Sequence, residues 1–174
     1  MKTNKIFTAF FTLLLFAAGA KAQESVTIHA NEDPDNNGVY YTSFYDRQHA
    51  YFIPGGVTAY TAYLEDESVI LRRVNGGILP KDEAVILRTF GTSEITMYVS
   101  EYDANKDIDN QLDGVDEDMD QDGSNYYMLS YGQNYLNFYK MNSEMKLKAH
   151  KAFIKRSSSK PYFAPALRVT FSDK

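Results

Sequence analysis

The feature that most constrains the fold of this chain is the regular alternation of short apolar or aromatic runs with turn-forming residues. Ten such runs have the length and composition of strands, at 39–45, 49–53, 58–64, 68–74, 83–89, 94–102, 126–131, 135–141, 148–155 and 166–171. Clusters of Gly, Pro, Asn or Asp separate many of them, and these residues favour tight turns. No helix is expected, because even residues 142–152 place apolar side chains at every second position.

These runs predict a single all-β domain of about ten short strands, and we prefer a β-sandwich over a closed barrel. Within 94–102, Met97 and Val99 alternate with Thr96 and Tyr98, which predicts one buried and one exposed face. The chain has 14 Tyr and 11 Phe residues, which favour strands, and no cysteine. The absence of cysteine excludes disulfides, thiol nucleophiles and thiolate metal sites. Strand order and oligomeric state are left open.

The first 22 residues have the pattern of a signal peptide. Two lysines precede an apolar run at 6–18, and a small-x-small cleavage signal follows at 20–22. The apolar run is shorter than the roughly 20 residues that span a bilayer. Gln23 would follow the cut, where a lipoprotein has cysteine. We therefore expect export to the periplasm, the cell surface or the medium, with no membrane insertion after cleavage.

The rest of the chain divides into a polar lead-in at 23–38 and the β domain at 39–174. Three of the 18 basic residues and none of the 23 acidic ones lie in the signal peptide, so the net charge after cleavage is −8. Nucleic acids and anionic membranes reward a basic surface. We therefore expect neither of them as a partner.

A long acidic segment, residues 103–125, interrupts the strands, and loops of this length are usually functional or disordered. Three of its carboxylates have the spacing that begins a calcium loop, and we call them the aspartate triplet: Asp118, Asp120 and Asp122. Residues 33–38 hold a poorer copy. Neither copy is complete, because the twelfth position holds Leu129 or Phe44 instead of glutamate. We expect a solvated acidic loop, with calcium binding as the alternative, and predict no metal or cofactor.

The sequence has no signature of catalysis. It lacks the G-x-S-x-G motif, and the spacing of His29, His49 and His150 matches no zinc motif. His49 and His150 each precede an apolar strand, where we expect a structural role. Glu83 and Glu94 are predicted to be exposed at strand starts, and no carboxylate has an apolar context that would raise its pKa. We therefore expect no enzymatic activity and name no catalytic or cofactor-binding residue.

Tyrosines cluster along the predicted strands. The clusters are Tyr40, Tyr41 and Tyr45; Tyr60 and Tyr63; and Tyr126, Tyr127, Tyr131, Tyr135 and Tyr139. Exposed rings on a sheet can stack on sugars or anchor a protein partner. The stronger expectation is that alternate tyrosines lie in the core with their hydroxyl groups at its rim.

An ordered set of segments resembles a known module. These segments are 41–45, 49–60, 78–80, 84–88, 126–130, 136–140 and 149–154. Together they resemble the β-rich module found near the C-terminus of many exported Bacteroidetes proteins, where it often follows leucine-rich or immunoglobulin-like repeats. The resemblance covers residues 39–171 and implies an all-β domain in an exported or surface setting. It implies no activity and no catalytic residue. We expect this chain to depart from the module in standing alone, and its loop at 103–125 is unusually rich in Asp.

Three hypotheses for function follow. The first is an exported, non-catalytic, surface-associated binding or structural module whose partner is a protein or an envelope component. The second is a glycan-binding module that uses exposed tyrosines and calcium held by the acidic loop. The third is a small exported hydrolase with spatially paired carboxylates.

Overall fold

The computed structural model describes residues 23–132, 135–157 and 164–172, so the signal-peptide prediction concerns residues outside it. In the described part of the chain, no helix has the length and apolarity needed to cross a membrane. The described residues form 14 strands and no helix, which confirms the predicted all-β class. The strands are β1 (Ser25–His29), β2 (Asn31–Glu32), β3 (Val39–Phe44), β4 (Ala50–Phe52), β5 (Val57–Glu65), β6 (Ser68–Arg73), β7 (Ile78–Leu79), β8 (Val85–Phe90), β9 (Glu94–Ser100), β10 (Leu112–Val115), β11 (Asn125–Gly132), β12 (Tyr135–Lys140), β13 (Lys151–Arg156) and β14 (Ala166–Ser172).

All ten predicted strands are present, and four short strands were not predicted: β1, β2, β7 and β10. The interpretation of 23–38 as a polar lead-in was wrong, because β1 and β2 form there. β1 pairs with β9 along its whole length, with Ser25 opposite Tyr98. Its inward side chain Ile28 is buried while its neighbours face solvent, so a strand with few apolar residues still contributes to the core.

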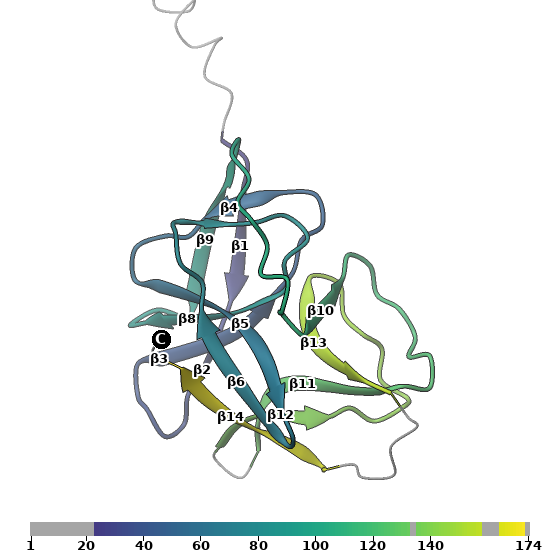
Figure 1. Cartoon of the computed structure of the whole chain (residues 1–174). Helices are drawn as coiled ribbons and strands as arrows, with labels where there is room; N and C mark the ends of the chain where they lie inside the picture. The colour runs from purple at the N-terminus through teal and green to yellow at the C-terminus, as the bar shows by residue number, and fades with distance from the viewer. Residues whose placement is uncertain (1–22, 133–134, 158–163, 173–174) are drawn as a thin grey trace, which may run out of the picture.

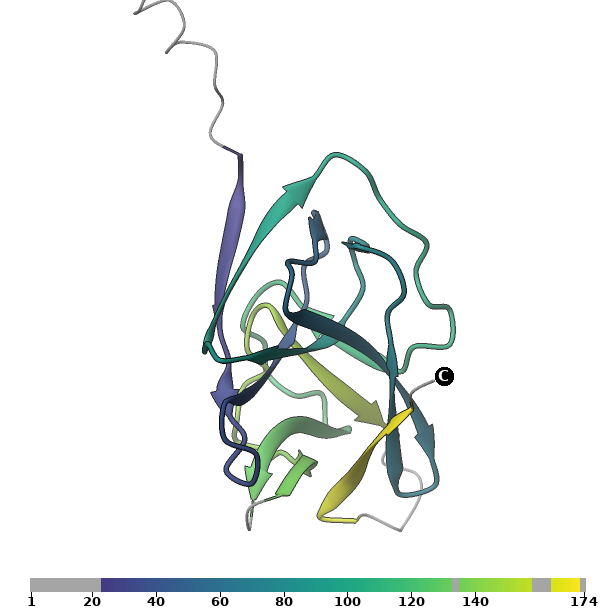
Figure 2. The ribbon, with the colours of Figure 1, turned by 90° about the vertical axis from the view of Figure 1, so that its left-hand side faces the viewer.

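The ten-stranded sheet, in the order β10-β13-β11-β12-β14-β6-β5-β8-β3-β2, curls until its ends approach each other (Figures 1 and 2). Isolated hydrogen bonds cross between the ends: for example, the Tyr45 amide donates to the His150 carbonyl (3.3 Å), and the Tyr131 hydroxyl donates to the Asn31 carbonyl (3.3 Å). No strand ladder closes the circle in the described residues. The preference for an open, sandwich-like domain over a closed barrel is therefore confirmed.

The hollow of the curled sheet is filled by the larger hydrophobic core. Strands from both halves of the sheet supply it, with Leu71, Ile86 and Phe138 all fully buried. β6 and β14 join the halves in parallel, with Val69 opposite Val169. Burial of such large side chains stabilises the fold by roughly 1.5–3 kcal/mol each.

A second, four-stranded sheet in the order β1-β9-β4-β7 packs against the outer surface of the large sheet. Ile95 and Met97 of β9 face inward and meet Val85 and Leu87 of β8 in a second core. Thr96 and Tyr98 face outward, as the alternation in β9 predicted. The large sheet is thus covered on both surfaces where these strands overlap.

Candidate functional site

Polar and charged side chains gather where residues 103–111 run past the segment before β8 and the middle of β5. They line a cavity of about 260 Å³. Its walls are formed by Tyr45, Asp82, Glu83, Ala84, Lys106, Asp107, Asn110, Leu112 and Asp113. A neighbouring cavity of about 200 Å³ shares Glu83, Lys106 and Asp107. We call this region the polar end and take it as the candidate site.

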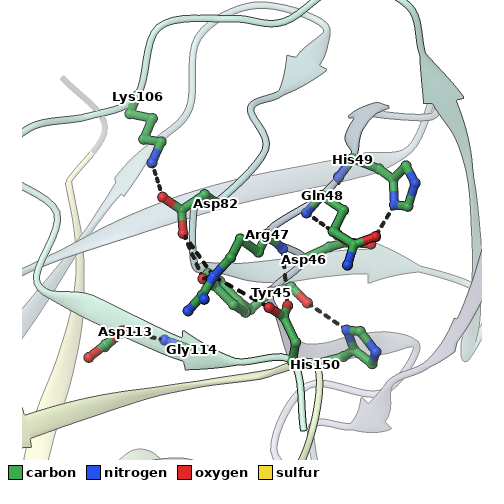
Figure 3. A network of polar contacts seen from close by, with 11 residues as sticks. Tyr45, Asp46, Arg47, Gln48, His49, Asp82, Lys106, Asp113, Gly114 and His150 are labelled. Atoms are coloured by element: carbon green, nitrogen blue, oxygen red, sulfur yellow. Dashed lines mark hydrogen bonds and ion pairs between the residues drawn. The ribbon is translucent and has the colours of Figure 1, made fainter.

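The Tyr45 hydroxyl lies at the centre of one group of polar contacts in the polar end (Figure 3). It donates to Asp82 Oδ1 (2.6 Å) and accepts from Arg47 Nε (3.3 Å). Arg47 also pairs with Asp116 (3.4 Å), while Lys106 pairs with Asp82. Hydrogen bonds from Lys106 and Tyr45 hold the pKa of Asp82 below its usual range. These contacts join the turn after β3 to the start of β8 and to the long loop.

Asp46 shapes the turn that leads into β4. Its Oδ1 accepts from the Gln48 amide (2.7 Å), and its Oδ2 accepts from the Tyr51 hydroxyl (2.6 Å). Burial raises the pKa of Asp46, but hydrogen bonds led by that of Tyr51 outweigh it, so the pKa is lowered. The His49 ring lies 3.2 Å from Asp46 Oδ2, which confirms the structural role predicted for His49 at the start of a strand.

His150 and Gly114 contact the backbone and the ring of Tyr45 and fix its position. The His150 ring nitrogen Nδ1 lies 3.2 Å from the Tyr45 carbonyl oxygen (Figure 3), and His150 has a positive φ of 57° directly before β13. His150 therefore also has the predicted structural role. The Tyr45 ring packs directly on the backbone of β10, because a Cβ atom at Gly114 would overlap the ring. Glycine is required at that position by close approach rather than by backbone angle.

Glu83 contradicts its prediction as an exposed strand-start residue, since it is only 4% exposed. Its Oε2 accepts from the Asp107 amide (3.0 Å), and its Oε1 accepts from the Asn110 side-chain amide. Burial raises the pKa of Glu83, although these hydrogen bonds oppose the shift. The expectation that no carboxylate has a raised pKa was therefore wrong. Glu94, by contrast, is exposed as predicted and lies 3.8 Å from His29.

The loop at 107–112 covers an edge of β5 that has no strand partner. β8 pairs with β5 only up to Tyr60. Beyond that point, the Ala62 amide donates to Asn110 Oδ1 (3.0 Å), and the Gln111 amide donates to the Ala62 carbonyl (2.8 Å). Asn110 also donates to the Ala84 carbonyl (2.8 Å). Part of the acidic segment thus replaces a strand, because unpaired backbone groups are costly to bury.

Glu83 and Asp107 differ in acidity in the way that acid–base pairs of enzymes do. Burial raises the pKa of Asp107, but hydrogen bonds led by that of Tyr63 outweigh it and lower the pKa. Its Oδ2 also accepts from the Thr61 hydroxyl (2.8 Å). The oxygen atoms of both carboxylates accept hydrogen bonds from the protein itself. This arrangement anchors the loop, and a reacting group would have to displace those hydrogen bonds.

The aspartate triplet lies further along the acidic segment and does not converge on one point. Each member faces a different lysine: Asp118 pairs with Lys148 (2.6 Å), Asp120 with Lys146 (3.3 Å) and Asp122 with Lys155 (2.6 Å). The hydrogen bond from Lys155 is the main cause that lowers the pKa of Asp122. Across the described residues, no three acidic or histidine side chains are grouped to hold a metal ion. The structure therefore gives the triplet a lysine-pairing role.

The acidic segment is also not one continuous loop. β10 lies within it and pairs with β13, with Leu112 opposite Ile154. Met119 forms a further bridge to Leu147. Residues 33–38, the poorer calcium-like copy, form a turn in which Asp33 Oδ1 accepts from the Asp35 amide (3.1 Å).

Half of the ten clustered tyrosines lie in the core, in line with the expectation that alternate tyrosines are buried. Five are buried: Tyr41, Tyr45, Tyr60, Tyr126 and Tyr127. Tyr135 is exposed, and the others of the clusters are half-buried. The exposed tyrosines that the glycan hypothesis requires therefore do not form a row on these strands in the described structure.

The chain matches no protein-family model, no curated protein and no solved structure.

Proposed function

We propose that this protein is an exported, non-catalytic binding module whose partner is a protein or another component of the cell envelope. The observation that carries the proposal is the outer face of the small sheet. Tyr98 of β9 is 48% exposed, and Phe52 of β4 is 40% exposed. Aromatic residues are enriched in protein interfaces, and they often provide most of the binding energy.

Strand alternation directs both rings to the same side. Tyr51 and Met97 point into the second core, so the residues that follow them, Phe52 and Tyr98, point outward. Continuing the β4–β9 register by one residue from the Tyr51–Val99 pair sets Phe52 opposite Tyr98. We call these two residues the outer aromatic pair.

The surroundings of the outer aromatic pair also suit a protein partner. Beside it, the hydroxyl groups of Thr27 and Thr96 lie 3.0 Å apart on the same face. β1 is the edge of this sheet in the described structure, and an open edge offers backbone groups to an incoming strand. The predicted signal peptide supports export. The resemblance to the Bacteroidetes module, likewise a proposal, supports a surface setting.

The other two hypotheses have weaker support. The glycan hypothesis needs exposed tyrosines and calcium, but only Tyr135 of the clustered tyrosines is exposed and the aspartate triplet faces lysines. The hydrolase hypothesis needs carboxylates that are free to react, whereas Glu83 and Asp107 accept hydrogen bonds from the loop they anchor.

The experiment compares the wild-type protein with the double variant F52S/Y98S. Each protein is used to capture partners from the envelope fraction of the producing cells, and the affinity of the captured partner is then measured with purified components. We expect the double substitution to weaken binding by about tenfold or more, since central aromatic anchors contribute roughly 2 kcal/mol or more. Tyr135→Ser, which alters an exposed tyrosine outside the small sheet, is the matched control. Unchanged affinity of F52S/Y98S would contradict the proposed surface.

A further inference from the structure

A small cavity of about 140 Å³ lies at the seam where the ends of the curled sheet approach each other. β2, β3, β11, β12 and β13 supply its lining: Asn31, Tyr41, Thr42, Ser43, Met128, Leu129, Ser130, Tyr131, Leu136 and Lys151. β2 pairs with β3 only at Tyr40 and Tyr41, and β13 pairs with β11 only up to Tyr127. The cavity therefore occupies the stretch in which β3 and β11 have no strand between them.

Among the described residues, Lys151 is the only cationic one that lines this cavity, and its environment is unusual for a lysine. It is half-buried, and its Nζ donates to the Thr42 hydroxyl (3.1 Å). Burial lowers the pKa of Lys151, and no charged neighbour opposes the shift. Among the described residues, no carboxylate forms an ion pair with it. The burial of a cation without a counter-charge is energetically unfavourable.

Several other lysines differ from Lys151 because they are exposed and paired with an acidic residue. Five lysines each pair with an aspartate, namely Lys81, Lys106, Lys146, Lys148 and Lys155. Those five side chains are 43–62% exposed, where an ion pair contributes little to stability. Lys148 and Lys155 lie on either side of Lys151 in the sequence, yet the more buried lysine is the one without a carboxylate.

The remaining lining suits a small organic anion better than a bare ion. Thr42, Ser43 and Ser130 carry hydroxyl groups, which can donate to a carboxylate or accept from a ligand hydroxyl. Met128 and Leu136 provide apolar surface. A cavity of about 150 Å³ holds a molecule about the size of benzene, which sets the scale of the ligand.

We propose that this seam cavity is a binding site for a small hydroxy-carboxylate, whose carboxylate pairs with the Lys151 ammonium while the surrounding hydroxyl groups hold its polar substituents. The ligand supplies a counter-charge that no described residue provides. The site is separate from the outer aromatic pair, so it stands or falls independently of the proposed partner surface.

The test is a titration of the isotope-labelled protein with sodium lactate and sodium glycolate, followed by ¹⁵N–¹H NMR. The neutral counterparts 1,2-propanediol and ethylene glycol are added at matched ionic strength. We expect carboxylate-specific shifts confined to the amides of Thr42, Ser43, Ser130 and Lys151. A response of the same size to the neutral compounds, or no response of these amides to either carboxylate, would overturn the proposal.

Two variants separate binding from folding. Lys151→Met keeps most of the length of the side chain and removes its charge, and it should weaken carboxylate binding by about ten- to a hundredfold. Lys148→Met removes an exposed, paired lysine and should leave binding unchanged. A direct measurement of the Lys151 pKa in the wild-type protein is independent of both variants. That pKa should rise when carboxylate is added, and a pKa unaffected by saturating carboxylate would also overturn the proposal.

Discussion

Asn110→Ala is expected to destabilise the protein strongly, although Asn110 lies in a long acidic loop. Its side-chain amide forms four hydrogen bonds: Oδ1 accepts from the amides of Ala62 (3.0 Å) and Leu112 (3.1 Å), and Nδ2 donates to the Ala84 carbonyl (2.8 Å) and to Glu83. Three of these bonds join neutral groups, worth about 0.5–1.5 kcal/mol each, and the fourth joins a carboxylate, worth about 1.5–3 kcal/mol. Because Asn110 is half-buried, water replaces some of the lost hydrogen bonds in the variant. We therefore expect the free energy of unfolding to fall by about 3–5 kcal/mol.

Urea unfolding at neutral pH measures this loss as a change in the free energy of unfolding. Asp109→Ala is the matched control, because Asp109 is an exposed neighbour in the same loop. It should change the stability by less than about 0.5 kcal/mol. Hydrogen exchange at the Ala62 amide should accelerate in N110A and not in D109A. A loss below about 1 kcal/mol in N110A would refute the claim that the loop replaces a strand at the edge of β5.

Three further predictions concern the polar end and the aspartate triplet. Gly114→Ala forces a methyl group into the Tyr45 ring and should cost about 1–3 kcal/mol in urea unfolding, while Gly55→Ala, which has open space around it, should cost less than that. Asp46→Asn replaces one of the two accepting oxygens with an NH2 group, so the side chain can no longer accept from both the Gln48 amide and the Tyr51 hydroxyl, and it should cost about 1.5–3 kcal/mol at neutral pH. Because the pKa of Asp46 is lowered in the folded state, its stabilisation is present above the unfolded value and is lost as the pH falls through the folded one. The stability difference between wild type and D46N should therefore shrink below a pH of about 4, and a difference that stays constant down to acid unfolding would contradict it. Removing calcium with EDTA, or adding it, should leave the melting temperature unchanged, because the aspartate triplet faces lysines; a rise with calcium would show that those pairs give way to a metal.

The sequence predicts those strands that have a strong apolar or aromatic pattern, and it misses the short or polar ones. All ten predicted strands have an apolar run of their own. β1 has only Val26 and Ile28 as apolar residues, and it becomes a strand because β9 offers it a partner. β10 contains Gly114 and an aspartate, and it forms because β13 lies beside it. Partners distant in the sequence therefore decide these elements, and local propensity does not reveal them.

The polar end could be predicted only in part. Asp46, two residues before a Gln-His pair, has the local spacing of an aspartate that binds the backbone amides of its own turn. The burial of Glu83 depends on Asn110, which lies 27 positions further along the chain. The one local signal was that Glu83 directly precedes the buried run 84–87. Long-range hydrogen bonds of this kind leave no spacing rule in a single sequence.

The most direct test of the proposed function is site-specific photo-crosslinking in cells that produce the protein. A photoreactive phenylalanine analogue replaces Tyr98 in one variant and Tyr135 in another, since both positions are exposed but only Tyr98 lies on the outer face of the small sheet. The proposal predicts a discrete cross-linked adduct from position 98 and none of the same mass from position 135. Equal labelling from both positions, or no adduct from position 98, would contradict it.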